Sequence, residues 1–139
     1  MDLSLLEKAL EDDSNYNLIE TNIQEIKDKK NNILQQLSLE RVLLKDYHKK
    51  LKEYMYVDSI EELKEGHVLR YINLNNMDNI KLSASVILCS INMNKKGIAI
   101  VVKIFNNKHI TLFLDKILLF KKFSNSEKIL LNAIKLLNK

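Results

Sequence analysis

Apolar residues recur at alternating steps of three and four over residues 19–54, a pattern that predicts one long helix. About five heptads without glycine or proline are typical of a coiled coil, in which this stripe meets that of a second chain. We therefore expect a homo-oligomer. The alternative is that the helix packs against its own chain and buries the same stripe internally. Two of the seam positions, Lys30 and Glu40, are not apolar. The seam positions are Ile19, Ile23, Ile26, Lys30, Ile33, Leu37, Glu40, Leu44, Tyr47, Leu51 and Tyr54.

The apolar pattern changes near Tyr54 from a helical period to the alternation of strands. The charge changes there too. Residues 1–53 contain nine Lys and Arg against eleven Asp and Glu, a net of −2, whereas residues 54–139 contain thirteen against seven, a net of +6. We predict two domains, a helical coiled-coil region at residues 1–53 and a β-domain at residues 54–139. The first is expected to open with a shorter helix that has Leu3, Leu6 and Leu10 on one face.

The segment from Ser59 to Gly66 predicts a short helical turn ahead of the first long strand. Ser59 and Glu62 have the spacing of a capping box. Gly66 is one of only two glycines in the chain, and it follows the turn where a positive φ is common. We expect it to let the chain reverse into the strand that begins near His67.

Beyond Gly66, short apolar segments separated by asparagine-rich turns predict an antiparallel meander of about five strands. Residues 80–92 are expected to form one long bent strand, and residues 106–107 a tight two-residue turn. Such a meander favours a small antiparallel β-barrel or a curled sheet. Ser124 and Glu127 then predict a capped C-terminal helix. The expected fold class is therefore α+β.

The apolar segments are shorter than the roughly 18 residues that a membrane-spanning helix needs. The N-terminus is acidic where a signal peptide is basic. The single cysteine, Cys89, allows no internal disulfide and fits a reducing compartment. We expect a soluble intracellular protein without a membrane span, in which Cys89 is a small buried residue of a strand.

The chain lacks the usual sequence motifs of enzymes and metal sites. Two glycines are too few for a P-loop, a dinucleotide fingerprint or a nucleophile elbow. His48, His67 and His109 do not have zinc-site spacing, although folding could bring His67 and His109 together. We therefore predict no catalytic activity, no cofactor and no metal site.

Three segments carry a resemblance to a family of proteins. They are YMYVDSIEELKEGHVLRYINL, the long apolar region of paired strands that follows it, and LDKILLFKKFSNSEKILLNAIKLL. With the N-terminal heptads, they resemble small uncharacterised proteins of nucleocytoplasmic large DNA viruses, the giant viruses. The chain departs from that family at residues 82–86, where a glycine pair is expected and Ser83, Ala84 and Ser85 stand instead. The resemblance implies a viral protein of the virion or of the viral factory in the host cytoplasm, and it supplies no catalytic residues.

The charge of the β-domain makes nucleic acid the alternative partner. Against it, lysine dominates over arginine, aromatic residues are few, and the same lysines would protect strand edges. We predict a non-catalytic structural or assembly protein that self-associates through the coiled coil and binds other viral structural proteins through the β-domain. The alternative is a basic accessory protein that binds DNA or RNA. Its expected contacts are Arg70, Lys95, Lys96, Lys103 and Lys108, with Lys121 and Lys122 nearby.

Overall fold

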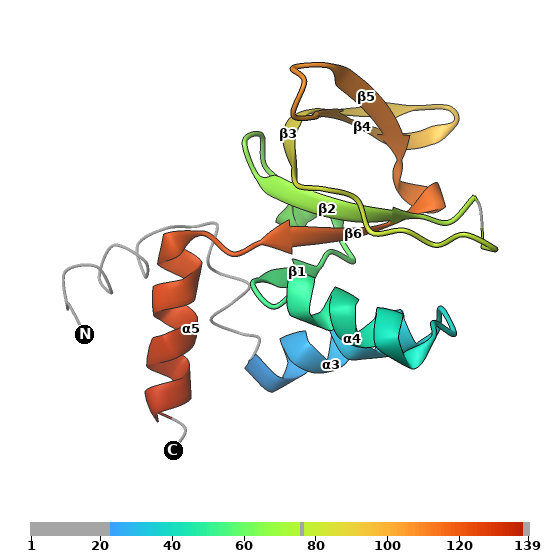
Figure 1. The fold of residues 1–139 in the computed structure, drawn as a ribbon. Helices are drawn as coiled ribbons and strands as arrows, with labels where there is room; N and C mark the ends of the chain where they lie inside the picture. The colour runs from blue at the N-terminus through green and yellow to red at the C-terminus, as the bar shows by residue number, and fades with distance from the viewer. Residues whose placement is uncertain (1–22, 76, 138–139) are drawn as a thin grey trace. The chain divides into compact units, whose positions relative to one another are not determined.

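The computed structural model describes residues 23–75 and 77–137, whose helices and strands are labelled in Figure 1. These residues divide into two compact units. The helical unit contains residues 23–55 and 123–137, and the sheet unit contains residues 56–122 apart from residue 76. The C-terminal helix thus belongs with the N-terminal helices, whereas the boundary predicted near Tyr54 groups it with the strands. The expected helix at Leu3, Leu6 and Leu10 and the seam position Ile19 lie outside the described residues.

The N-terminal part of the helical unit is a pair of short helices, α3 (Ile23–Gln35) and α4 (Arg41–Lys50). The buried residues of α3 are Ile26, Lys30 and Leu34, which are four apart and therefore share one helix face. Figure 1 shows α4 running back alongside α3. The apolar stripe is therefore covered within the helical unit.

The predicted long coiled-coil helix over residues 19–54 was wrong. The chain leaves the helical conformation at residues 36–40, where Ser38 has a φ of 53°. Serine has a modest helix propensity because its hydroxyl competes for backbone hydrogen bonds. A break here lets the two halves of the stripe pack on each other. Glu40 is the exposed N-cap of α4, and Tyr54 lies in a strand rather than in a helix.

The last helix of the helical unit is α5 (Asn125–Leu137), and a reciprocal capping box begins it. The Ser124 N–H donates to the Glu127 carboxylate at 3.0 Å, and the Glu127 N–H donates to the Ser124 hydroxyl at 3.1 Å. This is the arrangement that their spacing predicts. The apolar face of α5 joins that of α3 in one cluster, formed by Ile26, Leu130 and Leu131 with Ile23, Met55, Phe123 and Ile134 packed around them.

The strands form a six-stranded sheet in the order β1-β6-β2-β3-β4-β5. Strands β2 to β5 follow one another as a meander, and β6 returns beside β2. Every pairing from β6 to β5 is antiparallel. The boundary between the two units falls within β1. The strands are β1 (Tyr54–Tyr56), β2 (Val68–Asn73), β3 (Val86–Asn94), β4 (Gly97–Lys103), β5 (His109–Phe113) and β6 (Ile117–Lys122).

The sheet bends sharply where β3 leaves β2. Strand β2 pairs with β6 over residues 69–73 but with β3 only at Val68 and Leu69. As a result the sheet folds over on itself. Figure 1 shows β4 and β5 lying over β2 and β6, with β3 joining the two parts. The core of the sheet unit lies among these strands and consists of Val57, Leu63, Leu69, Val86, Leu88, Ile100, Val102, Leu112, Ile117 and Leu119.

Residues 80–92 are not the single bent strand that was expected. Strand β3 begins only at Val86, and before it Leu82 forms one isolated bridge with Ile72. The register shifts between Leu88 and Ser90, so Cys89 lies at a β-bulge. Its side chain is half-buried, with a free thiol, and does not belong to the buried core that the sequence suggested.

The turn before β2 is present with the positive φ predicted for Gly66, but the Ser59 hydroxyl caps the N–H of Glu61 rather than that of Glu62, its partner in the predicted capping box. Ser59 is the N-cap of the 3-10 helix η2 (Ile60–Glu62), and its hydroxyl accepts the Glu61 N–H at 3.3 Å. Gly66 has a φ of +91°, and its N–H donates to the Leu88 carbonyl at 2.8 Å. The chain therefore reverses at Gly66 and is tied to β3 at the same residue.

The turn between β4 and β5 extends over residues 105–107 rather than over residues 106–107 alone. The Ile104 N–H donates to the Lys108 carbonyl at 2.9 Å, and the Asn107 N–H donates to the Ile104 carbonyl at 3.0 Å. Asn107 has a φ of 61°, a conformation that asparagine tolerates better than most residues. The hydrogen bonds hold the turn in a defined shape.

Candidate functional site

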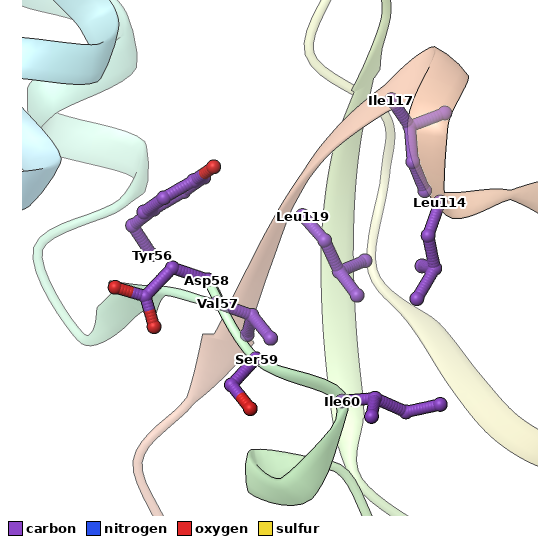
Figure 2. A pocket seen from close by; sticks show the side chains of 8 residues that line it. All are labelled: Tyr56, Val57, Asp58, Ser59, Ile60, Leu114, Ile117 and Leu119. Atoms are coloured by element: carbon purple, nitrogen blue, oxygen red, sulfur yellow. The ribbon is translucent and has the colours of Figure 1, made fainter. Parts of the chain in front are cut away.

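The sheet unit has a pocket between the segment that leads into η2 and the segment that joins η3 (Leu114–Lys116) to β6. The Val57 N–H donates to the Leu119 carbonyl at 2.9 Å, which holds the first segment against β6. Figure 2 shows the side chains of Ile60, Leu114 and Leu119 directed toward a common space. The lining residues are Tyr56, Val57, Asp58, Ser59, Ile60, Leu114, Ile117 and Leu119.

The pocket is small, and its lining is mixed. Five of the eight lining residues are aliphatic, but about half of the surface that the pocket exposes is polar. Its volume is about 150 Å³. Pockets that hold drug-sized ligands are usually about 300–1,000 Å³, whereas a cavity of roughly 150 Å³ takes a group the size of benzene. The space is therefore about the size of one side chain.

Tyr56 and Asp58 are polar lining residues at the edge of the pocket, and Figure 2 shows their side chains directed away from the space that Ile60, Leu114 and Leu119 face. Burial raises the pKa of the Tyr56 hydroxyl above its ordinary value, and the neighbouring carboxylates of Asp58 and Glu62 raise it further. Tyr56 is therefore a protonated hydrogen-bond donor at neutral pH. Its ring is held edge to face against Phe120, with 5.9 Å between the ring centroids. Two more carboxylates follow in the same segment, those of Glu61 and Glu65.

The pocket offers shape and charge for binding. The Ser59 hydroxyl in its lining is engaged in capping η2, as its contact with the Glu61 N–H shows. In the part of the chain that the structure describes, no group of three or more His, Cys, Asp or Glu side chains could hold a metal ion. The volume and the lining favour contact with a side chain over residence of a cofactor.

The histidines do not converge. His67 precedes β2, and its Nδ1 accepts the Lys64 N–H at 3.0 Å. His109 begins β5, and strands β3 and β4 lie between β2 and β5 in the sheet. His48 lies in α4 of the helical unit. The structure therefore does not bring His67 and His109 together as a ligand pair.

The basic residues proposed for nucleic-acid contact fall at separate places. Lys95 and Lys96 lie in the loop between β3 and β4, whereas Lys103 ends β4 and Lys108 lies just before β5. A strand of the length of β4 spans roughly 20 Å, so these two pairs mark opposite ends of it. Arg70 lies in β2 opposite Phe120. Of the two nearby lysines, Lys121 is buried and Lys122 is half-buried.

Sequence reasoning missed Phe105. Its side chain is 85% exposed in the turn between β4 and β5, close in sequence to Lys103 and Lys108. A signal was available, because the alternation that places Ile104 on the inner face of β4 places Phe105 on the outer side. The pocket had no such signal, since its two segments are far apart along the chain.

The positions predicted for an oligomer seam lie mostly inside the helical unit. Lys30, which interrupts the heptads, donates from Nζ to the carbonyls of Leu51 and Tyr54 at 2.9 and 3.0 Å. Burial, and then the charge of Lys27, lower the pKa of the Lys30 ammonium. Among the described seam positions, Ile26, Lys30, Leu37, Tyr47, Leu51 and Tyr54 are buried, Ile23, Ile33 and Leu44 are half-buried, and Glu40 is exposed.

Comparison with known proteins adds no identity, because no protein family, no curated protein and no solved structure matches the chain. The resemblance to giant-virus proteins therefore stays a prediction. So does a location in the virion or in the viral factory. Within residues 23–75 and 77–137, no helix is both long enough and apolar enough to cross a membrane.

Proposed function

We propose that the chain is a non-catalytic protein-binding module of a larger assembly and that the pocket of the sheet unit receives an apolar side chain of its partner. The pocket between η2 and η3 carries this proposal. Its five aliphatic lining residues offer contacts to one anchoring side chain, and its volume of about 150 Å³ is the size of one. Interfaces commonly concentrate their binding energy in a few such anchors, each seated in a well-packed pocket.

Carboxylates in the segment beside the pocket select the chemistry of the partner. Asp58 is exposed in the pocket lining, and Glu61 and Glu65 are exposed just beyond it. Complementary charges across an interface favour the correct partner and exclude like-charged ones. The partner segment is therefore a basic one, in which an apolar anchor is flanked by lysine or arginine.

A structural or assembly role in a virus is the setting that the sequence resemblance suggests. Such proteins act by contact, and a module with one anchor pocket can join another viral structural protein. Self-association is part of the same proposal, but a coiled coil is no longer its route. The solution mass of the full chain tests self-association, because a compact monomer at high concentration would contradict it.

A model peptide tests the pocket directly. The probe is a short lysine-rich peptide with one central leucine, added to isotope-labelled full-length protein and followed by NMR of the methyl groups. Shifts are expected for the methyls of Ile60, Leu114 and Leu119, which Figure 2 shows around the pocket. The peptide with alanine in place of leucine should lose most of these shifts, since it lacks the anchor.

Charge variants provide the matched comparison. Asp58→Lys reverses a carboxylate of the lining, whereas Asp78→Lys makes the same change at an exposed residue of the sheet unit outside the lining. Asp58→Lys should weaken binding of the peptide by more than Asp78→Lys does. Equal effects of the two variants, or methyl shifts confined to other parts of the protein, would contradict the proposed site.

A further inference from the structure

Charge is divided unevenly within the sheet unit. Residues 79–114 contain five lysines and one histidine but no aspartate or glutamate. This stretch includes all of β3, β4 and β5. The carboxylates of the sheet unit lie before or after it, at Asp58, Glu61, Glu62, Glu65, Asp78 and Asp115. The three strands therefore carry no negative side chain of their own, which suits a polyanion.

The register of the strands gathers part of this charge on one face. Lys103 pairs with Ile87 of β3 and with His109 of β5, so the three side chains form one cross-strand row. The flanking residues Leu88 and Val102 are buried in the core. Because side chains alternate along a strand, the row faces outward, and Ile87 and His109 are exposed.

Phe105 stands beside this row at the end of the hairpin. Its side chain is 85% exposed, and the other two residues of the turn are asparagines. The turn that carries it is closed by the hydrogen bonds between Ile104, Asn107 and Lys108. The ring is therefore presented by a defined backbone, with Lys103 and Lys108 on either side of it in the chain. We call Lys103, Phe105, Lys108 and His109 the β4–β5 tip.

We propose that the β4–β5 tip binds single-stranded nucleic acid, with the Phe105 ring stacked on a base and Lys103 and Lys108 paired with phosphates. An aromatic platform flanked by cations is the usual arrangement in proteins that bind single strands without sequence preference. A duplex offers no free base face to such a ring. An interfacial membrane anchor requires a larger apolar face than one phenylalanine supplies. These residues do not line the η2–η3 pocket, so the inference does not depend on the proposed function.

Fluorescence anisotropy with a labelled oligothymidylate of about 15 nucleotides tests the proposal on the full chain. Phe105→Ala should weaken binding by about tenfold, because base stacking on one aromatic ring is lost. Lys103→Gln and Lys108→Gln should each lower the dependence of log K on log salt by about 0.7. Since Phe105 is exposed, its replacement leaves the core intact.

The chain contains no tryptophan, so Phe105→Trp places a single indole at the tip. This variant should keep wild-type affinity, and its emission should be quenched when the oligonucleotide binds. The signal reports contact at the tip itself, which a general electrostatic attraction would not produce.

Lys45 and Lys49 of α4 provide the matched charge control, because they are exposed lysines of the helical unit. Lys45→Glu with Lys49→Glu should change affinity less than Lys103→Glu with Lys108→Glu. Three results would overturn the proposal. They are no measurable binding near physiological salt, unchanged affinity of Phe105→Ala with unquenched Phe105→Trp, or stronger binding to a duplex or to anionic phospholipid vesicles than to the single strand.

Discussion

The Lys30 ammonium donates a hydrogen bond of 2.9 Å to the backbone carbonyl of Leu51, the C-cap of α4. Nζ also reaches the Tyr54 carbonyl at 3.0 Å. The last carbonyls of a helix have no partner within the helix and carry partial negative charge. One buried lysine of α3 therefore satisfies two carbonyls near the end of α4. The residue that interrupts the heptad pattern is a polar link inside the helical unit.

Lys30→Met tests this link. Methionine keeps most of the length and the apolar stem of lysine but removes the donor. The Leu51 carbonyl keeps the Tyr54 N–H, which it accepts at 3.0 Å, but both carbonyls lose the hydrogen bond from the ammonium. We expect the free energy of unfolding to fall by about 1–3 kcal/mol, because buried hydrogen bonds from a charged group are lost. Relief of the buried charge offsets part of this cost. Chemical denaturation followed by circular dichroism measures the change.

Lys45→Met is the control for that experiment, because Lys45 is an exposed residue of α4. It should change stability by less than about 0.5 kcal/mol, as surface substitutions usually do. A stabilised Lys30→Met would mean that the desolvation of the ammonium outweighs its two hydrogen bonds.

Acid should weaken the helical unit through His48. Burial lowers the pKa of the His48 imidazole below its ordinary value of 6.5, and the charge of Lys30 lowers it further. The unfolded chain therefore takes up the proton first. Stability is full above about pH 6.5 and is lost as the pH falls from there through the lower pKa of the folded state.

The measurement is the thermal midpoint at several values between about pH 7 and pH 5, where histidine titrates. His48→Gln cannot gain this charge, so its midpoint should fall less steeply with acid than that of the wild type. His109→Gln removes an exposed histidine of the sheet unit and controls for the loss of one imidazole. Parallel curves for the wild type and His48→Gln would remove His48 as the cause.

Gly66 should be needed for its backbone conformation alone. Its φ is +91°, and a Cβ built at this residue would meet no atom within 4 Å. Gly66→Ala should therefore cost about 1–2 kcal/mol through backbone strain, without any clash. Gly66→Asn should cost less, since asparagine tolerates positive φ. Urea unfolding of the wild type, Gly66→Ala and Gly66→Asn ranks their free energies of unfolding. An equal loss of stability in the two variants would point to a cause other than φ.

Local signals in the sequence were reliable guides to local structure. The Ser124–Glu127 capping box and the positive φ of Gly66 each depend on a few neighbouring residues, and both are present. The heptads were informative in a narrower sense. They showed that a stripe of the chain is apolar. Which surface covers such a stripe depends on tertiary packing, which the heptads do not contain. The break near Ser38 has no glycine or proline to mark it.

The candidate sites depended on register and on contacts between distant segments. The pocket brings residues 56–60 against residues 114–119, and no periodicity along the chain predicts that meeting. The basic residues illustrate the same limit. The sequence shows how many basic residues there are but not which of them lie together. The pairing of β4 with β5 places Lys103 beside His109, and Lys95 and Lys96 lie at the other end of β4.

Ser38→Gly distinguishes the observed hairpin from a continuous helix by the sign of its effect. Ser38 has a φ of 53°, which costs an ordinary residue roughly 1–2 kcal/mol and glycine almost nothing. After the greater flexibility that glycine gives the unfolded chain is counted, the substitution should stabilise the protein by about 0.5 kcal/mol. In a continuous helix the substitution would destabilise the protein by a similar amount, because glycine is a poorer helix former than serine.

Lys45→Gly, within α4, should cost about 1 kcal/mol of stability under either arrangement and calibrates the urea unfolding measurement. A destabilised Ser38→Gly would contradict the positive φ of Ser38 as the reason for the break between α3 and α4.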